Sequence, residues 1–93
     1  MISKRTNYIA VIVPFFTRPY FMEVLRGVEA VSARLGRELV LYNVETNAQR
    51  DRYFYELPMH RKVDGLIIVS LTPDDSVSYK LRDSGLAVVL IDA

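Results

Sequence analysis

Four short apolar runs constrain this 93-residue chain more than any other feature of its sequence. Val, Ile and Leu dominate each run, and polar residues do not alternate with them. Strands that are covered on both faces, as in parallel sheets, have this pattern, whereas strands with one solvated face alternate. We therefore predict four buried parallel strands, at Tyr8–Val13, Glu38–Tyr42, Gly65–Val69 and Ala87–Ile91.

Apolar residues at helical spacing fill the first interval, from about Tyr20 to Leu35. Gly36 follows at the position where helices often end in a left-handed residue. Gly27, in the middle of this helix, costs about 1 kcal/mol relative to Ala, and close packing on the sheet would explain its presence. The apolar residues of the predicted helix face are Phe21, Val24, Leu25, Val28, Val31 and Leu35.

The other two intervals also begin with helix signals. Thr46 and Gln49 fit a capping box, which satisfies free backbone N–H groups at a helix start. Pro58 is expected to end or kink the helix that follows. Thr72 is predicted to cap the third helix, with Pro73 in its first turn.

The resulting order is β-α-β-α-β-α-β, which predicts the α/β fold class: an open sheet of four parallel strands with three helices and right-handed crossovers. A chain of this length has room for one small domain or for part of a larger one. Because the sequence stops directly after Ala87–Ile91, we expect a fragment. The free edge of its last strand would invite pairing with a second chain.

Composition excludes several classes of function. Lys and Arg number 12 and Asp and Glu 11, so the net charge of +1 gives little support for nucleic-acid binding by this chain alone. With no cysteine and one histidine, thiolate and multi-histidine metal sites are excluded, and we expect neither a metal nor a cofactor. No run reaches the roughly 18 to 20 apolar residues of a membrane span, and the start does not read as a signal peptide, so we expect a cytoplasmic protein.

A ligand site is expected where the strand order reverses, because open α/β sheets bind ligands beyond the carboxyl ends of their strands there. We predict the reversal between the first and third strands, where residues 14–19 and 70–73 meet, with Asp92 after the fourth strand. The first of these segments places aromatic residues around Thr17 and Arg18, a composition that suits a sugar or a flat heterocycle. These aromatic residues are Phe15, Phe16, Tyr20 and Phe21.

Each candidate residue also has a purely structural explanation. The aromatic side chains, Phe21 above all, suit the protein core as well as a ligand. Arg18 either holds an anionic group by a bidentate contact or is a solvated loop residue. Asp92 either accepts hydrogen bonds from ligand hydroxyls or caps a helix, and Ser70 and Thr72 are typical of turns and caps.

The common enzyme motifs are missing. The chain has neither G-x-G-x-x-G nor G-x-x-x-x-G-K-[ST], the two common phosphate-binding loops, and no G-x-S-x-G nucleophile turn. A phosphoacceptor receiver domain would carry acidic residues after the first strand and an Asp after the third, where this chain has Pro14–Phe16 and Ser70–Leu71. We therefore expect no enzymatic activity.

The sequence contains four segments, Lys4–Pro14, Pro19–Glu29, Val63–Ile68 and Val89–Asp92, that in this order, over nearly all of the chain, resemble segments of LacI/GalR-type transcriptional regulators. Lys4–Pro14 resembles the stretch that follows the hinge of these proteins, and Pro19–Glu29 resembles their aromatic loop and first helix. Val63–Ile68 resembles the start of their third strand, and Val89–Asp92 the end of their fourth. The chain is therefore similar to the N-terminal part of a periplasmic-binding-protein-like effector domain.

The resemblance implies that residues 1–93 form part of the N-terminal subdomain of such a domain, with residues 1–7 as the post-hinge segment. In this family a small metabolite, such as a sugar, binds between two subdomains and changes the affinity of a homodimer for operator DNA. An upstream helix-turn-helix headpiece, which this chain lacks, contacts the DNA, and the subdomains pair near the first helix and second strand. The ligand-binding residues that the resemblance carries over are Thr17, Arg18, Tyr20, Phe21, Ser70 and Asp92.

The chain departs from the family pattern at three positions. Arg18 replaces a common Asn and Phe15 a common Asp, so an acidic effector is an alternative to a sugar. Pro58 falls where the family continues a helix. The periplasmic sugar-binding component of a transporter shares this fold and is the alternative function, although residues 3–7 resemble post-hinge sequence and favour the regulator. A signal peptide upstream would indicate transport, and a basic helix-turn-helix would indicate a regulator.

Overall fold

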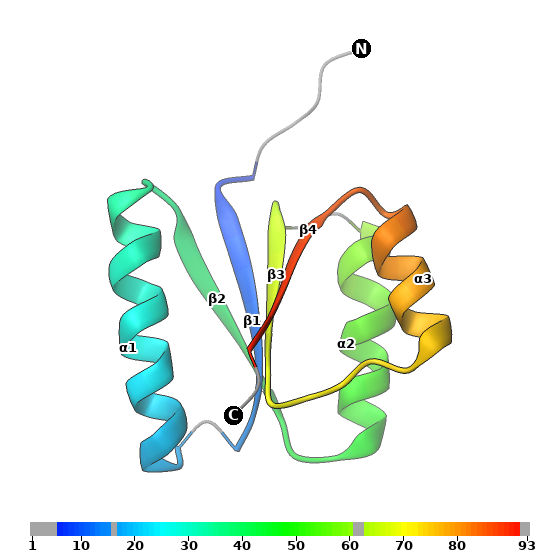
Figure 1. The fold of residues 1–93 in the computed structure, drawn as a ribbon, viewed down its shortest axis with the longest axis horizontal. Helices are drawn as coiled ribbons and strands as arrows, with labels where there is room; N and C mark the ends of the chain where they lie inside the picture. The colour runs from blue at the N-terminus through cyan, green and yellow to red at the C-terminus, as the bar shows by residue number, and fades with distance from the viewer. Residues whose placement is uncertain (1–5, 16, 61–62, 92–93) are drawn as a thin grey trace.

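The computed structural model describes residues 6–15, 17–60 and 63–91 and confirms the predicted order of elements (Figure 1). The strands are β1 (Tyr8–Pro14), β2 (Glu38–Val44), β3 (Gly65–Val69) and β4 (Ala87–Ile91). The helices are α1 (Pro19–Arg34), α2 (Asn47–His60) and α3 (Asp75–Asp83). All four strands begin where the apolar runs predict, and β1 and β2 extend slightly beyond them.

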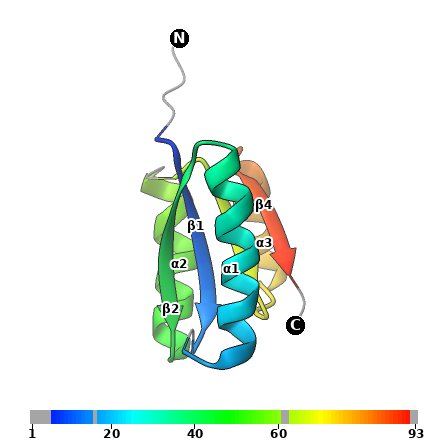
Figure 2. The same cartoon turned by 90° about the vertical axis from the view of Figure 1, so that its left-hand side faces the viewer.

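The four strands form one sheet in the order β2-β1-β3-β4, and every neighbouring pair is parallel, as predicted. The register pairs Val11 of β1 with Leu41 on one side and with Ile67 on the other. Helix α1 covers one face of the sheet, and α2 and α3 cover the opposite face (Figures 1 and 2). The sheet is therefore the middle layer of three.

The side chains of β1 alternate between two hydrophobic clusters, one on each face of the sheet. Ala10 and Ile12 belong to the cluster under α2 and α3, Val11 and Val13 to the cluster under α1, and all four residues are fully buried. A strand that buries both faces has no place for alternating polar residues, which explains the uninterrupted apolar run. The other buried members of the clusters are Val44, Phe54, Leu57, Val63, Leu66, Ile68, Val69 and Leu81.

Helix α1 packs less completely than its apolar stripe predicts. Its N-terminal half packs against the sheet, but Val31 and Leu35 are 52% and 66% exposed. Apart from the adjoining backbone of α1 itself, no atom of the described residues lies within 4 Å of the place where a Cβ on Gly27 would be, so the prediction that close packing selects this glycine is wrong. Both differences have one cause: within the described residues α1 is the sole helix on its face, and these three residues border an open groove of about 490 Å³ beside Ile67 and Ile91.

The predicted signals at the start of α2 and the end of α1 are confirmed. Gln49 donates its N–H to Thr46 Oγ1 at 3.1 Å, and Thr46 donates its N–H to Gln49 Oε1 at 3.2 Å, which completes the capping box. Gly36 adopts a φ of 73° after α1. Helix α2 continues through Pro58 to His60, so this proline does not end the helix. A proline so near the C-terminus of a helix removes one backbone hydrogen bond from its last turns only.

Helix α3 starts later than predicted, and the prediction that Thr72 caps it is wrong. The N-cap is Asp74, whose side chain accepts a hydrogen bond from the N–H of Val77 at 2.9 Å. Pro73 therefore precedes the cap instead of lying in the first turn. An Asp carboxylate caps as well as a Thr hydroxyl, and its negative charge is also favoured at the positive end of the helix dipole.

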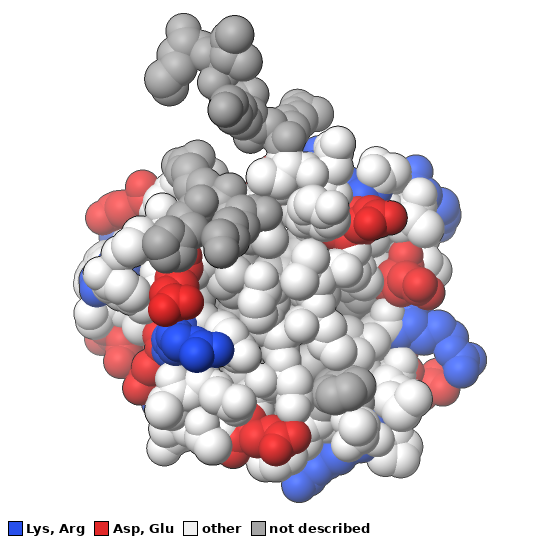
Figure 3. Space-filling model, turned by 180° about the vertical axis from the view of Figure 1, so that it is seen from behind, with Lys and Arg blue, Asp and Glu red and all other residues white. Residues whose placement is uncertain are grey.

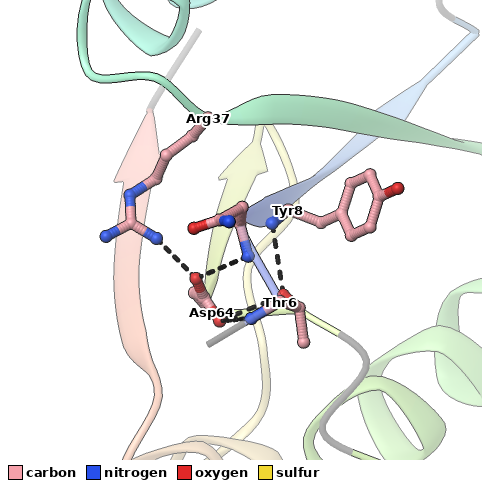
Figure 4. Close-up of polar contacts among 5 residues, drawn as sticks. Thr6, Tyr8, Arg37 and Asp64 are labelled. Atoms are coloured by element: carbon pink, nitrogen blue, oxygen red, sulfur yellow. Dashed lines mark hydrogen bonds and ion pairs between the residues drawn. The ribbon is translucent and has the colours of Figure 1, made fainter. Parts of the chain in front are cut away.

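The carboxylate of Asp64 ties the beginning of the described chain to the sheet (Figure 4). Its Oδ1 accepts hydrogen bonds from the N–H of Thr6 at 2.8 Å and from the Thr6 hydroxyl at 3.0 Å. Its Oδ2 accepts from the N–H of Asn7 at 3.0 Å and from Nη1 of Arg37. The pKa of Asp64 is lowered from 3.8 to about 2; the Thr6 N–H is the largest cause, burial opposes it, and the Asn7 N–H, the Thr6 hydroxyl and Arg37 lower it further.

Acid should weaken the fold through Asp64. A carboxylate with a lowered pKa in the folded chain is protonated more readily in the unfolded chain, so its contribution is complete above about pH 4 and is lost as the pH falls toward 2. We expect the midpoint of urea unfolding to drop more steeply between about pH 4 and pH 2 in the wild-type chain than in Asp64→Asn. Parallel curves for the two proteins would contradict this prediction.

Removing a side chain from the sheet should destabilise the chain according to its burial. Ile68 and Val11 are fully buried, so we expect Ile68→Ala to cost about 2–5 kcal/mol and Val11→Ala about 1–3 kcal/mol of unfolding free energy. Val89 on the edge strand β4 is 54% exposed and serves as the control, with an expected cost below about 1 kcal/mol for Val89→Ala. Urea denaturation measures all three, and equal losses at Val89 and Ile68 would refute the assignment of the core.

Candidate functional site

The strand order places a topological switch point between β1 and β3, as predicted. The chain leaves β1 toward α1 on one face of the sheet and leaves β3 toward α3 on the other (Figure 1). Open α/β sheets bind their ligands in the crevice that such diverging connections create. The carboxyl ends of the four parallel strands meet at one end of the sheet, opposite to the end where β1 begins (Figure 1).

The connection from β1 to α1 is a tight turn that presents an aromatic ring and a guanidinium group together. Phe15 adopts a φ of 46° and donates its N–H to the carbonyl of Val44 at 3.2 Å. Arg18 donates its N–H to the carbonyl of Phe15 at 3.0 Å, and its guanidinium lies 4.7 Å from the centroid of the Phe15 ring. Phe15 remains 40% exposed, so the ring and the cation are both available to a ligand.

The first turn of α1 divides its two aromatic residues between the surface and the core. Tyr20 is 54% exposed, whereas Phe21 packs against the buried residues Val11 and Val13. The two rings contact each other edge to face, with their centroids 5.4 Å apart. Phe21 therefore holds α1 on the sheet and supports Tyr20, and Tyr20 is the better placed of the two to contact a ligand.

The end of β3 supplies an unpaired hydroxyl group. Ser70 adopts a φ of 57° and donates its N–H to the carbonyl of Ile91 at 2.8 Å. Its Oγ is buried, and among the described residues it has no hydrogen-bond partner. A buried hydroxyl without a partner is costly, so a ligand that bonds to Ser70 would recover free energy.

The connection from β2 to α2 also contributes to this end of the sheet, which the sequence analysis missed. A hollow of about 400 Å³ lies beside Phe15 and Leu71 and is bordered by Glu45, Asn47 and Arg50. Its remaining lining residues are Pro14, Val44 and Thr46. The position of residues 45–47 directly after a parallel strand was the signal that could have identified them, but Thr46 was interpreted as a helix cap alone.

The charged side chains around this hollow already have partners within the protein. Glu45 accepts a hydrogen bond from the Asn43 amide at 2.8 Å, and Arg50 pairs with the carboxylate of Asp51 at 3.1 Å. Arg18, by contrast, contacts an aromatic ring and forms no ion pair with a described residue. This arrangement suits a ligand that stacks on a ring, forms hydrogen bonds with hydroxyl and amide groups, and carries an anionic group at Arg18.

The predicted site residues are thus placed unequally. Thr17, Arg18 and Tyr20 lie exposed on or beside the β1–α1 turn, and Ser70 lies at the end of the neighbouring strand β3. Phe16 and Asp92 lie outside the described residues, so their part in the site stays a prediction. Within the described part of the chain, no group of three or more His, Cys, Asp or Glu residues could hold a metal ion.

An open parallel α/β sheet with a hollow at the carboxyl ends of its strands is an architecture in which ligand-binding sites are common. The family model described as periplasmic binding proteins and sugar binding domain of LacI family matches residues 6–93. The chain therefore belongs to this family. Within the described residues, no helix is long and apolar enough to cross a membrane.

Relatives with assigned functions are transcriptional regulators. The chain is 33% identical over 88 residues to the HTH-type transcriptional repressor PurR of Photobacterium profundum, a match that covers 94% of the chain and 26% of the relative. It is 23% identical over 88 residues to catabolite control protein A of Staphylococcus epidermidis, covering 95% of the chain and 27% of the relative. The chain thus spans about a quarter of the length of the curated relatives that it matches.

Solved structures of regulators share the fold. The transcriptional regulator CelR in complex with cellobiose superposes with a TM-score of 0.77 at 25% identity, covering 94% of this chain and 28% of that one. The LacI family regulator CCPA from Weissella paramesenteroides, with bound glucose, gives a TM-score of 0.72 at 20% identity over 89% of this chain and 31% of that one. These likenesses confirm the predicted fold, a periplasmic-binding-protein-like fragment of LacI-family regulators.

Proposed function

We propose that this chain is part of the effector-sensing domain of a cytoplasmic transcriptional regulator. A sugar or a related metabolite binds at the carboxyl ends of β1, β2 and β3, in a cleft that a second subdomain completes. Effector binding changes the geometry of a homodimer and so the affinity of a helix-turn-helix headpiece for operator DNA. The 93 residues form one wall of the cleft and carry neither the headpiece nor the second subdomain.

One observation carries this proposal: the switch-point end of the sheet combines a cation, an exposed aromatic ring and an unpaired hydroxyl group. Arg18 and Phe15 form the cation and ring pair, and Ser70 supplies the hydroxyl. We propose that Thr17 and Tyr20 complete the hydrogen bonds on this side and that Phe21 supports them. Asp92, next to Ile91 in the sequence, is proposed to accept hydrogen bonds from ligand hydroxyls.

The relatives favour regulation over transport and over catalysis. The two relatives above are a repressor and a catabolite control protein, and both solved structures are transcriptional regulators. Two of the names also include a carbohydrate, cellobiose for CelR and glucose for CCPA. The sequence encoded upstream of this segment would distinguish a regulator from a transport protein, because a helix-turn-helix sequence belongs to a regulator and a signal peptide to a transport protein.

The edge of the sheet at β2 supports a homodimer as part of the proposal. Viewed from behind Figure 1, the surface over β2 carries few charged side chains, and charged residues surround it (Figure 3). Leu41 on β2 is 40% exposed, and a hollow of about 400 Å³ between β2 and α1 is lined by four apolar residues, Val11, Leu25, Leu39 and Leu41, and by the charged Arg26 and Glu29. An uncovered apolar strand edge also offers backbone N–H and C=O groups for pairing.

Replacement of Arg18 by Ala should distinguish the binding of an anionic effector from the binding of a neutral one. We expect Arg18→Ala to weaken binding of glucose 6-phosphate about 10-fold or more, because a charge-assisted hydrogen bond is lost, and to change glucose binding much less. NMR titration of the ¹⁵N-labelled wild-type and variant chains with glucose, cellobiose and glucose 6-phosphate measures the affinity for each of the three ligands. The shifts should concentrate at Phe15, Arg18 and Ser70.

Arg26→Ala is the matched control for this experiment. Arg26 lies on α1, the helix that Arg18 precedes as its N-cap residue, but its side chain is 79% exposed and pairs only loosely with Glu23 at 3.9 Å. The Arg26→Ala variant should bind glucose, cellobiose and glucose 6-phosphate with the affinities of the wild-type chain. Shifts that avoid the switch-point end of the sheet, or an equal loss in both variants, would refute the proposed site.

Replacement of Leu41 by Glu should dissociate the proposed dimer. A buried carboxylate without a partner opposes association, so Leu41→Glu should sediment as a 10.7 kDa monomer where the wild-type chain forms a larger species. Leu90→Glu on β4, where the residue is 59% exposed, is the matched control at the opposite edge of the sheet. A monomeric wild-type chain, or dissociation by Leu90→Glu alone in sedimentation velocity, would contradict pairing through β2.

A further inference from the structure

The chain turns sharply just before β1, and Asp64 holds both residues of the turn. Asn7 adopts a φ of 66°, a left-handed conformation that an Asn tolerates better than most residues. The backbone N–H groups of Thr6 and Asn7 both donate to the carboxylate of Asp64 (Figure 4). Tyr8 donates its N–H to Thr6 Oγ1 at 3.2 Å, which closes the turn. The direction in which the chain enters β1 is therefore fixed by side-chain contacts.

Asp64 is itself held rigidly. It directly precedes β3, and it donates its N–H to the carbonyl of Tyr8 at 2.8 Å. Its side chain is only 18% exposed. A carboxylate that is partly buried and receives several hydrogen bonds has little freedom to move, so it is a fixed acceptor for Thr6 and Asn7.

Arg37 connects the same carboxylate to the end of α1. Arg37 donates its N–H to the carbonyl of Ser32 at 2.9 Å, a hydrogen bond that closes the C-terminus of the helix. Its guanidinium donates to Asp64, and its side chain is 25% exposed. The next residue, Glu38, donates its N–H to the carbonyl of Asn7 at 2.9 Å. The end of α1, the start of β2 and the entry to β1 are thus bonded to one another.

We propose that Asp64 and Arg37 are positioning residues that form a joint, which fixes the direction of the segment preceding β1 relative to the C-terminal end of α1. Asp64 orients the two backbone N–H groups of the turn, and Arg37 makes that orientation depend on the position of α1. The joint stands on these contacts alone. Its use in regulation rests on the proposed function, since α1 starts directly after Arg18 of the proposed effector site and ends three residues before Arg37 of the joint.

Amide–water exchange in the ¹⁵N-labelled chain tests the joint without any effector, so its failure is separate from failure of the proposed function. Asp64→Ala should raise the exchange rates of the Thr6 and Asn7 amides about tenfold or more, because both donate to the charged carboxylate and lose that hydrogen bond. The amides of Ile12 and Ile68 in the sheet should change less than about twofold. A uniform rise at all four amides would show a role in global stability alone and would overturn the proposal.

Two further variants test the link to α1. Arg37→Ala leaves the carboxylate in place, so it should raise exchange at Thr6 and Asn7 by a smaller factor, about two- to fivefold. In the double variant the two effects should not add, because both act on one network. Asp51→Ala, which removes a carboxylate paired with Arg50, is the control and should leave these amides unchanged. No effect of Arg37→Ala on either amide, or full additivity, would refute the joint.

Discussion

The structure depends on the burial of β1 between two parallel neighbours. Its residues Ala10 to Val13 have no exposed surface, because β2 and β3 pair with its edges and helices cover both its faces. Right-handed crossovers then send the first connection to one face and the next two to the other, which creates the switch point. The candidate ligand site therefore follows from the way in which one apolar strand is enclosed.

The sequence was sufficient to predict this architecture, because its main signals are local. The uninterrupted apolar runs marked all four strands, and β1 and β3 are buried on both faces, but the edge strand β4 is largely exposed, with Val89 at 54% and Leu90 at 59%. Thr46 with Gln49 marked the start of α2 correctly. The same kind of reasoning assigned the cap of α3 wrongly to Thr72. Asp74 also satisfies the capping rule, and its extended backbone directly before the helix makes Asp74 the residue that caps. Local signals thus identify elements well and resolve their boundaries less well.

The site was harder to predict, because it depends on contacts between connections that are distant in sequence. The aromatic character of the β1–α1 turn pointed to Phe15 and Arg18, and the structure pairs the two. Asn47 had a local signal, its position just after a strand, but nothing local indicated that Arg50 borders the same end of the sheet or that Ser70 has a buried and unpaired hydroxyl group. The exposure of Val31 likewise depends on what covers α1, which helical spacing does not encode.

Helix α1 runs along the sheet from the end that carries Arg18 to the end that carries Arg37, and it is held less tightly than the strands. Close-packed interiors resist small deformations, and β1 is held on every side, so the strands are poor transmitters of a displacement. Helix α1 differs, because an open groove lies beside it and Val31 and Leu35 are more than half exposed. Helices α2 and α3, in contrast, share one core cluster. If a ligand at Arg18 displaces one element as a rigid body, a displacement of α1 disturbs the packing least. Arg37, just beyond the other end of α1, contacts Asp64 and would pass that displacement on to it.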